Sequence, residues 1–220
     1  MLLAVVATTQ ECRALLAQVE VTPLELGPYR AFSTPTAAVV ISGIGPAASA
    51  AATATALAVS PFEAVLSLGI CGGFTGATEI GDVVVATEIV AADLGADSPE
   101  GFQAMGQLGW ADHDHPVERP LVSRLAAVLG DVVTGPVLTV STVTGTDARA
   151  MDLAQRHGAV AEAMEGWGVL TAALPHGLPV LEVRTVSNLV GARDLTTWDL
   201  PAAFASLTTV GVTLLGQPWF

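Results

Sequence analysis

The stretch Ala64-Val-Leu-Ser-Leu-Gly-Ile-Cys-Gly-Gly-Phe74 joins an almost continuous apolar run to a cluster of glycines. Apolar and polar residues do not alternate in the run, which is typical of a strand that is covered on both faces. The glycines follow at the carboxyl end of this strand, where ligands of open α/β sheets collect. Because glycine lets the backbone approach a flat ring closely, we predict a binding site there. A simple turn is the alternative that this segment alone leaves open.

Comparable apolar runs alternate with alanine-rich stretches of helical character along the chain. We predict strands over residues 2–7, 37–42, 64–69, 82–91, 137–143 and 180–186. We predict helices over residues 11–18, 46–59, 117–129, 148–157, 164–174 and 200–215. Strands that alternate with helices indicate an α/β protein, and this length suits a single three-layer α/β/α domain over residues 1–220.

The segment from Ala92 to Pro116 interrupts this order, because its glycines, acidic residues and aromatic residues follow no clear period. A connection of this length is usually functional or disordered, and Phe102, Met105 and Trp110 favour a loop that binds a ligand or contacts another subunit. The stretch Asp112-His-Asp-His-Pro116 resembles a metal site only superficially. Adjacent residues of an extended loop point in different directions, and no distant set of ligands accompanies them. We expect a solvated acidic loop and no bound metal.

The composition excludes several classes of function. All eight basic residues are arginine, so a lysine Schiff base and a P-loop lysine are excluded. The net charge of −13 would repel a phosphate backbone, and we expect no nucleic-acid partner. No apolar run approaches the ~18 residues of a membrane helix, so we expect no membrane partner either. The two cysteines, Cys12 and Cys71, form no CxxC pair, which fits the reducing cytoplasm.

The stretch Gly43-Ile-Gly-Pro-Ala-Ala48 follows a predicted strand and opens a predicted helix, as the phosphate-binding turn of a dinucleotide fold does. Such a fold also needs an acidic residue at the end of a second strand, about 20 residues further on. Glu63 instead stands at the start of a predicted strand. A tight turn between strand and helix requires these glycines by itself. We therefore expect no nicotinamide, and we predict that the protein uses no cofactor.

Polar residues stand at the ends of three apolar elements. Glu11 follows the first strand, Glu165 precedes a helix, and Glu182-Val-Arg-Thr-Val-Ser-Asn188 is a strand with several polar residues. A buried strand that carries Arg184, Ser187 and Asn188 must satisfy their hydrogen bonds. Each carboxylate alone would more often be a helix cap, but together these groups predict a hydrolytic site.

The order of these motifs resembles the purine nucleoside phosphorylase superfamily over almost the whole chain. The motifs are Glu11, Ser42-Gly-Ile-Gly45, Gly69-Ile-Cys-Gly-Gly73, Ile80-Gly-Asp82, Met164-Glu-Gly166 and Arg184-Thr-Val-Ser-Asn188. The resemblance implies a nucleoside phosphorylase-like fold with a central mixed sheet, cleavage of an N-glycosidic bond, a small nucleoside substrate, and a homodimer or higher homo-oligomer. Within the superfamily the chain ends resemble methylthioadenosine/S-adenosylhomocysteine nucleosidases. They resemble the futalosine hydrolase family more closely, through Val186-Ser-Asn-Leu-Val-Gly-Ala-Arg-Asp194 and Trp198.

The resemblance also implies roles for individual residues. Glu11 matches the general base that takes a proton from water, and Arg184 matches the arginine that orients the polar cluster. Glu165 matches the carboxylate that binds the ribose hydroxyls. The further positions implied to bind substrate are Met164 beneath the sugar, Ile44 and Trp198 near the 5′ pocket, Cys71, Gly72 and Ser187, and Phe102 from a neighbouring subunit.

Asn188 departs from the pattern of the adenine-specific nucleosidases, which have an aspartate that protonates N7 of the purine. An asparagine cannot protonate the base, but its amide can donate to a 6-oxo group. The implied reaction is therefore hydrolysis of futalosine, which releases hypoxanthine and dehypoxanthine futalosine in menaquinone biosynthesis. Arg193 and Arg149 are candidates to bind the carboxylate of this substrate.

Three alternatives remain open from the sequence. One is a nucleosidase of the methylthioadenosine/S-adenosylhomocysteine type. A second is a phosphorylase, although no arginine occurs between Arg30 and Arg119 where a phosphate site would need one. A third is a catalytically silent nucleoside-binding domain, against which the presence of both Glu11 and Glu165 argues.

Overall fold

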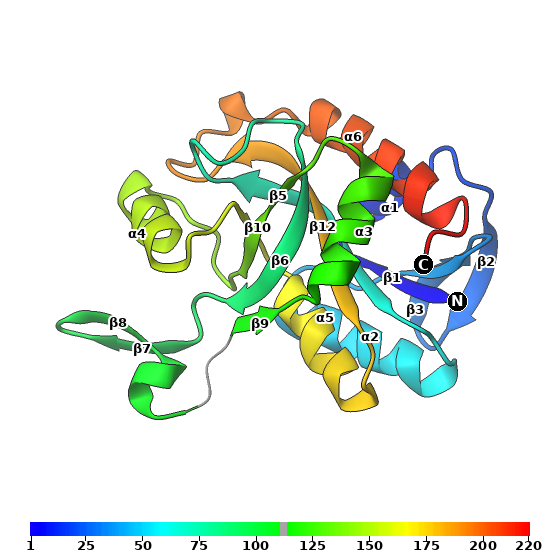
Figure 1. The fold of residues 1–220 in the computed structure, drawn as a ribbon, viewed down its shortest axis with the longest axis horizontal. Coiled ribbons are helices and arrows are strands. Elements are labelled where there is room, and N and C mark those ends of the chain that lie inside the picture. The colour runs from blue at the N-terminus through cyan, green and yellow to red at the C-terminus, as the bar shows by residue number, and fades with distance from the viewer. Residues whose placement is uncertain (111–113) are drawn as a thin grey trace.

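The computed structural model describes residues 1–110 and 114–220, and a large mixed β-sheet forms its centre (Figure 1). Ten strands of the described residues belong to this sheet, in the order β11-β10-β6-β12-β5-β1-β4-β3-β2, with β9 on β6. The strands are β1 (Leu2–Val6), β2 (Thr22–Leu26), β3 (Tyr29–Ser33), β4 (Ala37–Ile41), β5 (Val65–Gly73), β6 (Val83–Ala91), β9 (Asp114–Pro116), β10 (Val133–Thr139), β11 (Ala161–Ala163) and β12 (Val180–Leu189). Asp112 and His113 of the predicted acidic loop lie outside the described residues.

The central strands run in both directions, which confirms the predicted mixed sheet. β5 pairs in parallel with β1 and β12, whereas β12 and β6 are antiparallel. β11 pairs with both β10 and β5, so the sheet closes into a ring through β5, β12, β6, β10 and β11. The apolar runs of β1 and β5 are buried along almost their whole length, as expected for strands covered on both faces.

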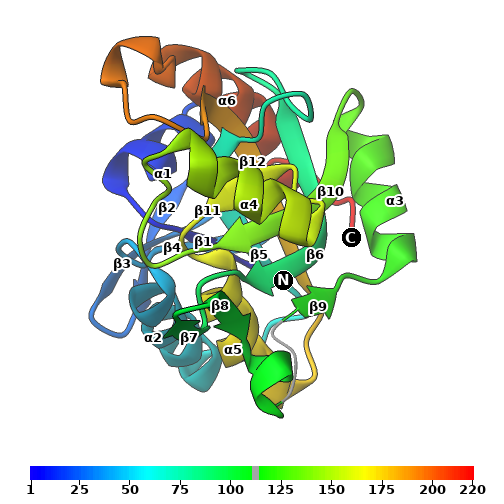
Figure 2. The same cartoon turned by 90° about the vertical axis from the view of Figure 1, so that its left-hand side faces the viewer.

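Helices cover both faces of the sheet. α1 (Thr9–Leu15) packs on α6 (Leu200–Leu215) on one face, and α2 (Pro46–Val59) packs on α5 (Gly166–Ala173) on the opposite face (Figures 1 and 2). α3 (Arg119–Leu129) lies against β6 and α6, and α4 (Asp147–His157) follows β10. Three short 3₁₀ turns cover Met105–Leu108, Leu174–His176 and Leu195–Thr197. No helix in the described parts of the chain is both long and apolar enough to cross a membrane.

Several predicted boundaries were wrong. The helix after β1 ends at Leu15 rather than at residue 18, and β10 spans Val133–Thr139 rather than residues 137–143. β5 does not stop before the glycine cluster but continues through Gly73, because β12 and β11 hydrogen-bond to the glycine backbone from both sides. The simple turn that the sequence left open at this point is therefore absent.

Two hairpins were not predicted. β2 and β3 form an exposed antiparallel pair whose turn contains Gly27 at φ +59°, and their residues are too polar to resemble buried strands. The segment after Ala92 contains β7 (Gly95–Ser98) and β8 (Gly101–Ala104), which pair with each other and project from the body of the molecule (Figure 1). Part of the irregular loop predicted there therefore forms a two-stranded hairpin.

The close packing of α2 on α5 depends on Gly168. A Cβ at this position would lie 2.0 Å from the carbonyl oxygen of Pro46 and 2.3 Å from Oγ of Ser49. We expect Gly168→Ala to lower the free energy of unfolding by about 1–3 kcal/mol, because the two helices must move apart. Urea denaturation measures this difference.

Gly145→Ala is the matched control, since a Cβ at this position meets no atom within 4 Å. We expect that variant to unfold at the same urea concentration as the wild type. Equal midpoints for the two alanine variants would contradict the role given to Gly168.

Candidate active site

A cavity of about 620 Å³ lies at the carboxyl ends of β1, β4, β5 and β12. This position agrees with the rule that open α/β sheets bind ligands at the ends of their strands. Nine of the residues predicted from the sequence line the cavity, namely Glu11, Ile44, Cys71, Gly72, Met164, Glu165, Ser187, Asn188 and Trp198. They come from distant parts of the chain, and the fold brings them together.

Glu11 lies in the first turn of α1, held by a reciprocal cap with Thr8. Its Oε2 accepts hydrogen bonds from the amide nitrogen of Thr8 at 2.9 Å and from Oγ1 of Thr8 at 2.7 Å. Its Oε1 accepts a hydrogen bond from the amide of Ile70 at 3.0 Å. Burial raises the pKa of Glu11, and the hydrogen bonds from Ile70 and Thr8 oppose this shift. Glu11 is therefore a fixed carboxylate that can serve as a base.

Arg184 lies inside β12 and is fully buried. Its Nε donates to Oε1 of Glu182 at 2.8 Å, its Nη1 to Oε2 of Glu165 at 3.1 Å, and its Nη2 to Oγ of Ser67 at 2.9 Å. The two carboxylates outweigh the cost of burial and raise the pKa of Arg184, so the guanidinium stays charged. Arg184 is not among the residues that line the cavity, and its role in orienting the polar cluster stays a prediction. It is a positioning residue that holds Glu165.

Glu165 is held from two sides. Its Oε2 pairs with Arg184, and its Oε1 accepts a hydrogen bond at 3.1 Å from the amide of Gly45. Gly45 has φ +96°, a conformation that favours glycine, and it caps α2. The carbonyl of Glu165 also accepts a hydrogen bond from Ser49 at 3.0 Å. These contacts leave the carboxylate at the cavity wall with a fixed orientation.

Asn188 stands where β12 bulges against β5. Its Oδ1 lies 2.8 Å from the donating Oγ of Ser187, which also lies 3.0 Å from the carbonyl of Cys71. Its Nδ2 donates to the carbonyl of Leu189 at 3.0 Å. The amide has two hydrogens on Nδ2, and this contact uses one of them. The other hydrogen remains for a ligand.

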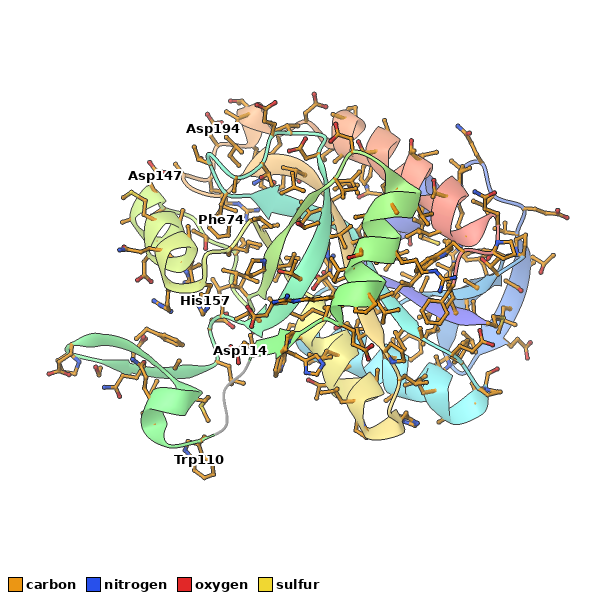
Figure 3. All side chains as sticks on the ribbon, viewed as in Figure 1. Phe74, Trp110, Asp114, Asp147, His157 and Asp194 are labelled. Carbon is orange, nitrogen blue, oxygen red and sulfur yellow. The ribbon has the colours of Figure 1, made fainter. Side chains whose placement is uncertain are left out.

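Phe102 does not line this cavity, although it was predicted among the binding residues. It lies on the projecting hairpin, and the guanidinium of Arg156 stands 4.8 Å from its ring centroid. Both residues line a second cavity of about 400 Å³ between the hairpin and α4. Trp110 follows the 3₁₀ turn after this hairpin and points away from the body of the molecule (Figure 3). A contribution of Phe102 from a neighbouring subunit stays a prediction.

No role was predicted from the sequence for two acidic groups near the site. Glu162 is buried and lines the cavity, and Glu182 is the fully buried partner of Arg184. Burial raises the pKa of each carboxyl group. The signal available in the sequence was a glutamate within an apolar stretch, a residue type that is almost never buried without a partner. Cys71, by contrast, has its pKa raised to about 12 by burial, so it is no nucleophile at neutral pH.

The two arginines considered for a substrate carboxylate lie in different places. Arg193 lines the main cavity, with its guanidinium 5.7 Å from the ring centroid of Trp198. Arg149 lines the second cavity. The loop that carries Arg193 is fixed by Asp147 at the start of α4, whose Oδ1 accepts a hydrogen bond from the amide of Ala192 at 2.9 Å (Figure 3). Within residues 1–110 and 114–220, no group of three or more His, Cys, Asp or Glu is arranged to hold a metal ion.

The chain is similar to a known protein family and to several known proteins. The model of the phosphorylase superfamily matches residues 3–210. Futalosine hydrolase of Streptomyces coelicolor is 50% identical over 76% of this chain and 73% of its own length. Futalosine hydrolase of Acidothermus cellulolyticus is 44% identical over 84% of this chain and 78% of its own. A methylthioadenosine/S-adenosylhomocysteine nucleosidase of Neisseria meningitidis has the same fold, with a TM-score of 0.83, 20% identity, and coverage of 98% and 99% of the two chains.

The ion cluster around Arg184 makes a prediction about stability. We expect Arg184→Met to lower the free energy of unfolding at pH 7 by about 3–5 kcal/mol, because it leaves two buried carboxylates without a counter-charge. The deficit should shrink as the pH falls towards the ordinary glutamate value, since the pKa of Glu182 is already raised and its protonation removes the uncompensated charge. Urea denaturation at several pH values measures both effects.

The control is Arg119→Met, because Arg119 is exposed at the start of α3. We expect that change to shift stability by less than about 0.5 kcal/mol at every pH. A deficit for Arg184→Met that is small, or that grows in acid, would contradict the described ion cluster.

Proposed function

The chain belongs to the phosphorylase superfamily and, within it, to the futalosine hydrolases, and we propose that it hydrolyses the N-glycosidic bond of futalosine. The products are hypoxanthine and dehypoxanthine futalosine, as in menaquinone biosynthesis. The observation that carries the proposal is that Glu11, Glu165 and Asn188 line one cavity from three separate elements. A base, a group for the ribose and a group for the purine are the three parts that such a reaction needs.

Glu11 acts as the general base in the proposed mechanism. It takes a proton from water, and the water oxygen bonds to C1′ of the ribose. The C1′–N9 bond breaks with its electron pair moving onto the purine, which leaves and takes a proton from solvent, while Glu11 returns to solvent the proton that it took from water. The sugar carries positive charge in such a transition state. Glu165 accepts hydrogen bonds from the ribose hydroxyls and stabilises that charge, which speeds the reaction.

Water is favoured over phosphate as the attacking group. A phosphate site is usually built from arginine or lysine, which bind its oxygens in charge-assisted hydrogen bonds. Among the described residues that line the cavity, Arg193 is the cationic one, and it stands with Trp198 on the loop after β12. Glu11 and Thr8 occupy the end of β1 instead, where a carboxylate would repel phosphate.

The base proposed for this site is hypoxanthine. Asn188 keeps one amide hydrogen towards the cavity, and this hydrogen can bind a 6-oxo group. A 6-oxopurine also carries negative charge better than adenine as it leaves, so it needs no acid at N7. A methylthioadenosine-type nucleosidase is the second candidate, supported by the likeness in sequence to such an enzyme of Colwellia psychrerythraea at 28% identity.

We also propose a homodimer or higher homo-oligomer that works in the cytoplasm on a small nucleoside. The hairpin of β7 and β8 supports the oligomer, because it projects from the body (Figure 1) and Phe102 is not among the residues that line the cavity of its own chain. The two free cysteines support a reducing compartment.

The direct assay incubates the purified protein with futalosine in phosphate-free buffer and follows base release by chromatography. Aminofutalosine, methylthioadenosine and inosine are tested in parallel. We expect hypoxanthine from futalosine and little base from the other three. Release only after addition of phosphate would make the protein a phosphorylase, and faster cleavage of methylthioadenosine would favour the second candidate.

The raised pKa of Glu11 sets the acid side of the pH profile. A base must be ionised, so kcat/KM should fall as the pH drops through the pKa of Glu11, above the ordinary value of 4.5. Thr8→Val removes the Oγ1 hydrogen bond that lowers this pKa, and we expect the acid limb to move to higher pH. Glu11→Gln should lower the rate by about 10²- to 10⁴-fold. An acid limb that Thr8→Val leaves in place would contradict the role of Glu11.

Arg193 is proposed to bind the carboxylate that futalosine carries beyond C5′, next to Trp198. We expect Arg193→Met to raise KM for futalosine about tenfold, as the loss of a charge-assisted pair allows. A futalosine analogue with the carboxylate converted to an amide should lose nothing further in that variant. Arg149→Met is the control and should leave KM unchanged; a larger effect of Arg149→Met would reverse the assignment.

A further inference from the structure

Three residues of neighbouring strands stand in one row at the wall of the cavity. In the register of the sheet, Glu162 of β11 is opposite Gly72 of β5, and Gly72 is opposite Asn188 of β12. Residues that are opposite one another on paired strands point to the same face of a sheet. All three line the cavity, so each is within reach of a ligand that fills it.

Gly72 contributes no side chain to the middle of this row. A Cβ at this position would lie 3.4 Å from Nδ2 of Asn188 and 2.8 Å from Cγ2 of Val190, so the side chain of Val190 reaches over the glycine. The strands on its two sides are separated by two strand spacings, or about 9–10 Å between backbones. Glu162 and Asn188 therefore flank a gap in the row at the cavity wall, which Val190 enters from the side of β12.

Glu162 enters this gap as a carboxylate with capacity to accept. Its Oε1 accepts a hydrogen bond at 2.8 Å from the amide of Thr144, and its Oε2 accepts one from Oγ1 of Thr144. Each carboxylate oxygen can accept a second hydrogen bond. Glu11 and Glu165 act in the proposed mechanism, in which Glu162 has no role. A buried carboxylate is costly, and one that lines a ligand cavity with acceptors to spare calls for a donor on the ligand.

Asn188 offers the opposite polarity across the gap. The contact from its Nδ2 to Leu189 leaves one amide hydrogen, and its Oδ1 already accepts a hydrogen bond from Ser187. The row therefore presents an acceptor on the β11 side and a donor on the β12 side. A 6-oxopurine has the matching pair on adjacent atoms, because N1 carries a hydrogen and O6 accepts. A 6-aminopurine has both reversed, with an acceptor at N1 and a donor at the 6-amino group.

We propose that Glu162 accepts a hydrogen bond from N1–H of the purine base and, together with Asn188, selects 6-oxopurines over 6-aminopurines. The inference rests on the proposed function and deepens it, since it assigns a role in specificity to a residue other than Glu11 and Glu165. An ionised Glu162 also faces the N1 lone pair of a 6-aminopurine with its own lone pair. Discrimination by an unpaired polar contact of this kind is stronger than discrimination by size.

The test measures binding of free bases by calorimetry and does not depend on turnover of any nucleoside. The probes are hypoxanthine, adenine, and 1-methylhypoxanthine, which lacks the hydrogen on N1. We expect wild-type protein to bind hypoxanthine about 10- to 100-fold more tightly than the other two bases, the range for a hydrogen bond to a charged group. This comparison needs no variant, so it stands even if a substitution impairs folding.

Glu162→Gln is the first variant, because glutamine keeps the shape and can still accept from the amide of Thr144. Its amide nitrogen would present a donor to N1, so we expect hypoxanthine to bind about tenfold more weakly and adenine to bind more tightly than in the wild type. Thr144→Val is the matched control, since it removes the hydroxyl that holds Glu162 but leaves the carboxylate. We expect it to change the ratio of hypoxanthine to adenine binding much less than Glu162→Gln does, because the carboxylate that accepts from N1–H is still present.

The outcomes separate the inference from the function on which it rests. Equal affinities of wild-type protein for hypoxanthine and 1-methylhypoxanthine would overturn the role of Glu162 and leave the hydrolase proposal standing. An unchanged ratio of hypoxanthine to adenine binding in Glu162→Gln would do the same. If the wild type bound none of the bases, both the inference and the purine site of the proposed function would be wrong.

Discussion

The buried guanidinium of Arg184 is the constraint on which the active-site end of the fold depends. It stands in a central strand, with no exposed surface, between β5 and β6. A charge in such a place is tolerated only when counter-charges and hydrogen-bond acceptors surround it. Glu182 from the same strand, Ser67 from β5 and Glu165 at the N-cap of α5 supply them. The ion cluster thus links β12 to β5 and to the start of α5, and it sets the direction of Glu165.

The space around this cluster is equally constrained. A Cβ on Gly69 would lie 2.5 Å from Oε1 of Glu11 and 2.9 Å from Nη1 of Arg184, so a larger residue would separate them. Glu11, Glu162 and Glu182 are buried, and burial raises the pKa of each of these carboxyl groups. Buried carboxylates of this kind lower the free energy of unfolding at neutral pH. An electrostatic contact between such a buried group and a ligand is also stronger than the same contact in water, as catalysis requires.

Much of the fold and site could be predicted because the signals are local. Continuous apolar runs predicted β1, β5 and β12. Glu11, Glu165 and Asn188 were predicted as site residues because they are polar and stand within or beside such runs. The parts of the fold and site that were not predicted depend on pairing between strands that are distant in the sequence. The closure of the sheet through β11, the pairing of the glycines of β5 and the position of Glu162 follow from register between distant strands, which no local pattern contains. The exposed hairpins were missed because they lack a buried face.

In the proposed reaction, a water molecule activated by Glu11 attacks the ribose. The most direct measurement is cleavage of futalosine in water labelled with heavy oxygen and in the presence of phosphate, followed by mass spectrometry of the sugar product. We expect one labelled oxygen at C1 of the sugar and no sugar phosphate. An unlabelled sugar product, or a sugar 1-phosphate, would contradict the account.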